Sequence, residues 1–173
     1  MAGRQPGKRP IKTRSSSRLG KKAEQKSLRA GERLGQMVDI DKIMDMLDWN
    51  NPPEVQEEGR ALAREVRCIN VFLQPGHPGH VKNVWDNCAI ILSERSDQTL
   101  RPYLYELFKW LEDMSWPGAI CVYNRLKSYH RNDMFEYVLD ECINEAKALD
   151  MENWLSILMS FVLPPAAAEG THL

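Results

Sequence analysis

The stretch LRPYLYELFKWLEDMSWPGAI, residues 100–120, decides the fold class of this chain. Its large apolar residues recur at spacings of 4, 3, 1 and 3, which places them on one face of a helix. These residues are Leu100, Leu104, Leu107, Phe108 and Leu111. Ser115 and Pro117 then predict an N-cap and a first-turn residue for a second helix. The stretch therefore predicts two helices joined by a short turn.

Helical periodicity continues on both sides of this stretch. Upstream, it predicts helices over 40–47, 53–66 and 83–92, with Asn51 or a neighbour and then Asn83 as N-caps. The short apolar run 68–73 fits a strand or a helix by pattern, and its helical surroundings favour a short buried helix. Downstream, the predicted helices cover 119–126, 133–149 and 151–162. The expected fold class is all-α.

A weak internal repeat indicates how these helices pair. A shift of 64 residues superimposes four positions: Leu47 on Leu111, Asn51 on Ser115, Pro53 on Pro117 and Leu62 on Leu126. Each unit consists of a helix, a capped turn and a helix that starts near proline. Because one such hairpin leaves an apolar face uncovered, the repeat predicts an array of stacked antiparallel hairpins.

The formal net charge of −1 hides two oppositely charged parts. Residues 1–36 hold eleven Lys/Arg and two Asp/Glu, a net of +9, whereas residues 37–173 hold twelve and twenty-two, a net of −10. The first part has no aromatic residue and few aliphatic ones, so we expect a disordered basic N-terminal extension. The expected helical-repeat domain covers 37–163, and a frayed C-terminal tail covers 164–173.

Composition excludes several classes of protein. Residues 1–36 contain no apolar run like that of a signal peptide, and the run 154–163 is about half of a bilayer span. The four cysteines are far apart and form no CxxC pair, which favours reduced thiols over a disulfide or metal framework. We therefore expect a cytoplasmic protein without a membrane segment.

Two segments carry a family resemblance: VWDNCAIILSERSD (84–97) and PYLYELFKWLEDMSWPGA (102–119). They resemble a family of small bacterial proteins that is a domain of unknown function. Its most specific element is W-L-x-D-M-N-W-P-G, here Trp110 to Gly118, with Ser115 in place of Asn. The resemblance covers Met37 to about Phe161 and implies a HEAT-like curl of helix pairs, but no established activity.

Within that resemblance, residues 1–36 are an addition. We expect Met37 to be the initiator and the basic segment to be an upstream extension of the reading frame. The intact mass of the natively expressed protein tests this expectation, because a species that retains residues 2–36 would contradict it.

Candidate chemistry is sparse. His77, His80 and Cys88 are weak candidate zinc ligands, because their loop provides no helical registration and a fourth ligand is not evident. Asp113, Ser115 and His130 suggest an acyl-transfer site, but no nucleophile elbow accompanies them, and helix capping explains Asp113 and Ser115. No phosphate-binding loop or HExxH motif occurs. We therefore expect no metal, no cofactor and no enzymatic activity.

The residues that we expect to bind a partner are aromatic residues near turns and one carboxylate: Trp49, Trp116, Tyr103, Tyr105 and Asp113. The leading interpretation is a non-enzymatic module that binds a protein partner, in its sharper form an immunity-type protein that neutralises a basic toxin. One alternative is an enzyme with an unfamiliar site near the His77–His80 loop. The other is nucleic-acid binding through residues 1–36.

Overall fold

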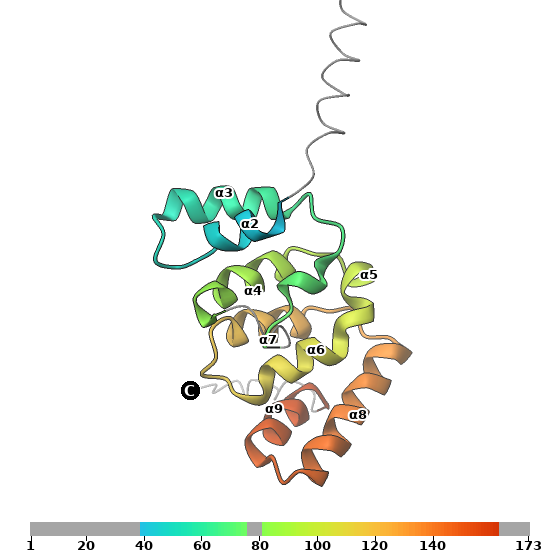
Figure 1. Cartoon of the computed structure of the whole chain (residues 1–173). Coiled ribbons are helices and arrows are strands. Elements are labelled where there is room, and N and C mark those ends of the chain that lie inside the picture. The colour runs from blue at the N-terminus through green and yellow to red at the C-terminus, as the bar shows by residue number, and fades with distance from the viewer. Residues whose placement is uncertain (1–38, 76–80, 163–173) are drawn as a thin grey trace, which may run out of the picture. The chain divides into compact units, whose positions relative to one another are not determined.

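Helices make up the regular structure of the part of the chain that the computed structural model describes, residues 39–75 and 81–162. The all-α prediction is confirmed, since these two ranges contain no strand (Figure 1). The expected extension over 1–36 and the expected tail over 164–173 lie outside the described residues. None of the helices in the two ranges is long and apolar enough to cross a membrane.

The first pair consists of α2 (Ile40–Met46) and α3 (Pro53–Ala63). Asp39 caps α2 by accepting a hydrogen bond from the backbone of Lys42 at 3.1 Å. Of the predicted caps for the next helix, Asn51 or a neighbour, it is the neighbour Pro52 that takes the N-cap position, without a side-chain hydrogen bond. The side chain of Asn51 donates instead to the carbonyl of Asp45, 2.7 Å away, at the end of α2. The helices approach closely at Gly59, where a Cβ atom would lie 2.9 Å from the Cβ of Met46.

Two short 3-10 helices precede α4: η1 (Ile69–Phe72) and η2 (Lys82–Val84). The predicted buried helix over 68–73 is thus a single 3-10 segment, with Ile69 and Phe72 buried. Helix α4 covers Trp85–Ser93. Asn83 does not cap it, because its side chain donates to Asp48 Oδ2, 3.1 Å away. This bond ties the start of α4 to the turn after α2.

The helix predicted over 100–111 is divided into four short pieces. These pieces are α5 (Asp97–Leu100), η3 (Arg101–Tyr103), α6 (Leu104–Lys109) and η4 (Trp110–Glu112). The division follows from Pro102, which has no N–H to donate and so interrupts a continuous α-helix. All five apolar residues that predicted the helix face are nevertheless buried.

The predicted start of α7 (Ala119–Lys127) is also wrong. Gly118, not Ser115, precedes the helix, and Pro117 lies outside it. Gly118 has φ 80°, and a Cβ atom there would lie 2.5 Å from the Cβ of Ala89 on α4. Only glycine satisfies both the backbone conformation and the close approach of α7 to α4.

The last pair consists of α8 (Asp133–Ala148) and α9 (Glu152–Val162), close to their predicted ranges. Helix α4 packs on α7, α6 on α8 and α8 on α9, so that α2–α3 and α8–α9 lie at opposite ends of the domain (Figure 1). The core contains Trp110, Phe108, Phe135 and Trp154. Trp154 also fixes α9 to α6, since its Nε1 donates to the carbonyl of Phe108 at 3.0 Å.

The 64-residue repeat holds only in part. Leu47 and Leu111 are both fully buried. Leu62, however, is 39% exposed whereas Leu126 is buried, so these two positions are not equivalent. Ile120 of α7 is also exposed.

Candidate functional site

A groove runs between the turn after η4 and the N-terminal half of α9. It consists of two adjoining hollows, of about 600 Å³ and 330 Å³, which share Glu112 and Asn153. The larger is also lined by Asp113, Met114, Ser115, Ser156 and Ile157, and the smaller by Asp150, Met151, Glu152 and Trp154. We call this surface the acidic groove, because it contains the carboxylates of Glu112, Asp113, Asp150 and Glu152.

Of the four carboxylates of the groove, Glu112 pairs with Lys109, whereas Asp113, Asp150 and Glu152 form no ion pair within the described residues. The described residues that line the two hollows include no Lys or Arg. The side chain and backbone of Ser115 hydrogen-bond Asp113 and lower the pKa of its carboxyl, and nearby Lys82 acts in the same direction. Asp113 is therefore ionised at neutral pH and exposed to solvent. Such a surface attracts cationic groups.

Lys109 contacts two residues that line the groove, Glu112 and Trp154. Its Nζ pairs with Glu112 and with Glu145, the latter at 3.0 Å, and lies 4.8 Å from the ring centroid of Trp154. Burial lowers the pKa of Lys109, but the hydrogen bonds to the two carboxylates outweigh it, so the pKa is raised. Lys109 is thus charged at neutral pH and links α6 to η4, α8 and α9.

The predicted binding residues lie in different surroundings. Asp113 lines the acidic groove, and Tyr105, which is 42% exposed, donates to Glu145 at 2.8 Å beside Lys109. Trp116 is partly buried, with its ring edge-to-face against Trp85 at 5.8 Å. Tyr103 is partly buried in η3 and does not line the groove.

Trp49 lies in the turn after α2, away from the groove lining. Its ring is 45% exposed, and its backbone N–H donates to the carbonyl of Asn83 at 3.0 Å. The predicted residues therefore do not form one platform, since only Asp113 belongs to the groove and Tyr105 to its border.

The groove also contains residues that the sequence did not indicate: Asp150, Glu152 and Asn153. They are far from Asp113 in the chain and reach it only because α9 packs on α6. The sequence signal for them is the pair of acidic residues around the start of α9, which is also what an ordinary helix N-terminus shows.

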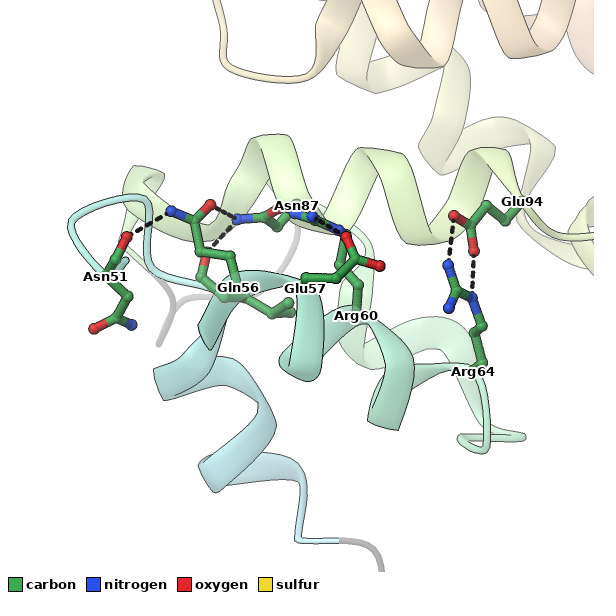
Figure 2. A network of polar contacts seen from close by, with 8 residues as sticks. Asn51, Gln56, Glu57, Arg60, Arg64, Asn87 and Glu94 are labelled. Carbon is green, nitrogen blue, oxygen red and sulfur yellow. Dashed lines mark hydrogen bonds and ion pairs between the residues drawn. The ribbon is translucent and has the colours of Figure 1, made fainter. Parts of the chain in front are cut away.

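A polar network joins the α2–α3 pair to α4 (Figure 2). The buried amide of Asn87 donates to the carbonyl of Leu47 at 2.6 Å and to Gln56 Oε1 at 2.8 Å, and its oxygen accepts from Arg60. Nearby, the guanidinium of Arg64 donates to both carboxylate oxygens of Glu94, at 2.9 and 3.2 Å. Since these groups are paired with one another, the network holds elements together and does not form an open site.

The alternative chemical sites lie only partly within the described residues. The Cys88 thiol is fully buried, which raises its pKa to about 12, while His77 and His80 lie outside the described residues. His130 is away from the groove, with its backbone N–H donating to Asp97 Oδ2 at 2.8 Å. Over 39–75 and 81–162, no group of three metal-ligating side chains occurs.

A family model described as Domain of unknown function (DUF5071) matches residues 82–172, more than half of the chain. The chain belongs to this family. The DUF5071 region begins at η2, later than the expected Met37, and contains the Trp110–Gly118 segment and all described residues of the acidic groove. The α2–α3 pair lies outside the region, although α4 within it binds the pair through Asn87. No curated protein and no solved structure matches the chain.

Proposed function

We propose that this protein is a non-enzymatic binding module whose acidic groove docks a basic protein partner. The observation that carries the proposal is the groove itself, where carboxylates of η4, its following turn and the start of α9 meet with no Lys or Arg in the lining. A basic segment of a partner supplies countercharge to Asp113, Asp150 and Glu152, since Glu112 already pairs with Lys109. Met114 and Ile157 offer apolar contact beside it.

The charge balance of the domain supports the same proposal. Residues 39–75 and 81–162 hold 12 Lys/Arg and 21 Asp/Glu. The cations Arg60, Arg64, Lys109, Arg125 and Arg131 are already in ion pairs within the domain. The carboxylates that remain create a negative field that steers a basic partner and accelerates its association.

The proposal includes two finer points. One is that the helix pairs form a HEAT-like array, the build that the family resemblance implies; the packing of α4 on α7 and of α6 on α8 supports it. In its sharper form the basic partner is a toxin and the protein a cytoplasmic immunity protein. A growth assay tests that form. A partner recovered from the source cell should arrest growth when it is expressed alone and not when it is co-expressed with this protein.

Calorimetric titration of the full chain with a hexalysine peptide, at low and at high salt, tests the groove. The variant Asp113→Asn/Glu152→Gln removes two charges of the groove. The matched control Glu54→Gln/Glu58→Gln removes two exposed charges of α3. We expect salt-sensitive binding that falls about tenfold in the groove variant and much less in the control. Equal losses in the two variants, or no binding at low salt, would contradict the proposal.

A further inference from the structure

Helix α8 has one covered side and one open side. Its covered side consists of buried residues, namely Phe135, Leu139, Cys142, Ile143 and Ala146. At helical spacing the opposite side consists of Asp133, Tyr137, Asp140, Glu141 and Asn144, all of them exposed. Helix α8 lies at one end of the domain, where α6 and α9 pack against it (Figure 1). We call the open side the α8 face.

Tyr137 lies at the middle of the α8 face and differs from three of the four other described tyrosines. Its side chain is 62% exposed and, among the described residues, makes no hydrogen bond or ring contact. The hydroxyls of Tyr105, Tyr123 and Tyr129, by contrast, are hydrogen-bonded to Glu145, Ser160 and the Asp97 carbonyl, respectively. Exposed tyrosine with a free hydroxyl is typical of a binding hot spot.

The charges of the α8 face are also unpartnered. Within the described ranges Asp133, Asp140 and Glu141 form no ion pair, whereas the adjacent Glu136 is held by Arg131. Lys147, in the last turn, is the only basic residue of the helix. Met134, 39% exposed, adds an apolar contact in the first turn. The face therefore combines apolar contact with excess negative charge.

We propose that the α8 face docks a basic amphipathic helix of the protein partner. Helix α8 has 16 residues, a length of about 24 Å, and two helices of that length pack side by side along their ridges. Tyr137 and Met134 contact the apolar residues of the partner helix, while Asp133, Asp140 and Glu141 pair with its Lys or Arg. This inference rests on the proposed function, because both assume a basic partner, and it adds a second surface to the groove.

The test uses the full chain and a labelled 16-residue Lys/Leu amphipathic helical peptide, with fluorescence anisotropy as the measurement. We expect Tyr137→Ala to weaken binding about tenfold. Asp140→Asn/Glu141→Gln should weaken it several-fold more than the matched control Glu54→Gln/Glu58→Gln, which removes the same charge from α3. Circular dichroism checks that each variant is folded, and because these side chains are exposed we expect unchanged melting temperatures.

Two results would overturn the inference. One is that Tyr137→Ala binds the peptide with the affinity of the wild type. The other is an equal loss of affinity in Asp140→Asn/Glu141→Gln and in the control Glu54→Gln/Glu58→Gln. If the peptide binds but only Asp113→Asn/Glu152→Gln weakens it, the α8 face is not the docking surface and the proposed function stands. If neither this peptide nor hexalysine binds at low salt, the proposed function fails as well.

Discussion

Asn87 donates a hydrogen bond from its side-chain amide to the backbone carbonyl of Leu47, 2.6 Å away and 40 positions earlier in the chain. The same amide binds Gln56, and its oxygen accepts from Arg60. One buried side chain of α4 therefore satisfies a carbonyl at the end of α2 and two side chains of α3. The α2–α3 pair is held in register by this residue.

Asn87→Ala should lower the free energy of unfolding by about 2–3 kcal/mol, because it leaves the carbonyl of Leu47 and the side chain of Gln56 without their partner in a buried place. Urea denaturation at neutral pH measures the change. The control Asn144→Ala removes an exposed amide from α8 and should be neutral or slightly stabilising. A loss at Asn87 no larger than in the control would show that the network does not stabilise the fold.

Gly118→Ala should destabilise the protein by about 2–4 kcal/mol, because it combines a left-handed backbone with a clash against Ala89. The double variant Gly118→Ala/Ala89→Gly removes the clash and keeps the backbone strain. In a double-mutant cycle measured by urea denaturation, we expect a favourable coupling between the two positions. Strictly additive changes in the free energy of unfolding would mean that α4 and α7 move apart without loss of stability.

Asp150→Gly should stabilise the protein by about 0.5–1 kcal/mol. Asp150 has φ 54° after the end of α8, where the backbone N–H of Met151 donates to the carbonyl of Ala146 at 2.9 Å. Glycine adopts this conformation without steric cost. Asp140→Gly, the same substitution within α8, should instead destabilise by about 1 kcal/mol. Because Asp150 also lines the acidic groove, Asp150→Gly should weaken hexalysine binding while it raises the melting temperature.

Asp97 should contribute to acid unfolding. Burial raises the pKa of its carboxyl, but hydrogen bonds from Arg125 and from the backbone of His130 outweigh burial, so the pKa in the folded protein is lowered. A carboxyl with a lowered pKa contributes stability above its unfolded pKa of about 3.9, and this stability is lost as the pH falls through the folded value.

The variant Asp97→Asn removes this contribution. Its free energy of unfolding should therefore fall less than that of the wild type between pH 6 and pH 3, as urea denaturation at the two pH values will show. Asp86→Asn, which removes an exposed carboxylate from α4, provides the comparison. A pH dependence in Asp97→Asn as steep as in the wild type would contradict the assignment.

The fold class could be predicted from the sequence because the helical spacing of apolar residues is kept even where the helix itself is interrupted. Leu100, Leu104 and Leu111 are all buried although Pro102 breaks their helix into pieces. Helix starts were predicted less well, because tertiary contacts decided them. Asn51 and Asn83 are good capping residues by type, but each bonds to a different element. Gly118 precedes α7 because α4 is too close for any side chain.

The candidate site was predicted only in part. Asp113 could be found because it lies in a recognisable turn. Trp116 was expected to bind a partner; Trp85 from α4 packs against it, and no local pattern indicates that contact. Tyr137 is not among the predicted binding residues. Only the packing of α6 and α9 shows which side of α8 is uncovered.

The contacts of Arg95 predict how the sequences of relatives of this protein vary. Its guanidinium donates to the carbonyls of Ala63 and Arg64 at 2.6 and 3.1 Å, so a side chain inside the DUF5071 region satisfies the end of α3, which lies outside the region. A relative without the α2–α3 pair has no carbonyls for this arginine to bind. Positions 87 and 95 should then lose their Asn and Arg together, and their joint presence in a family member marks the presence of the extra helix pair.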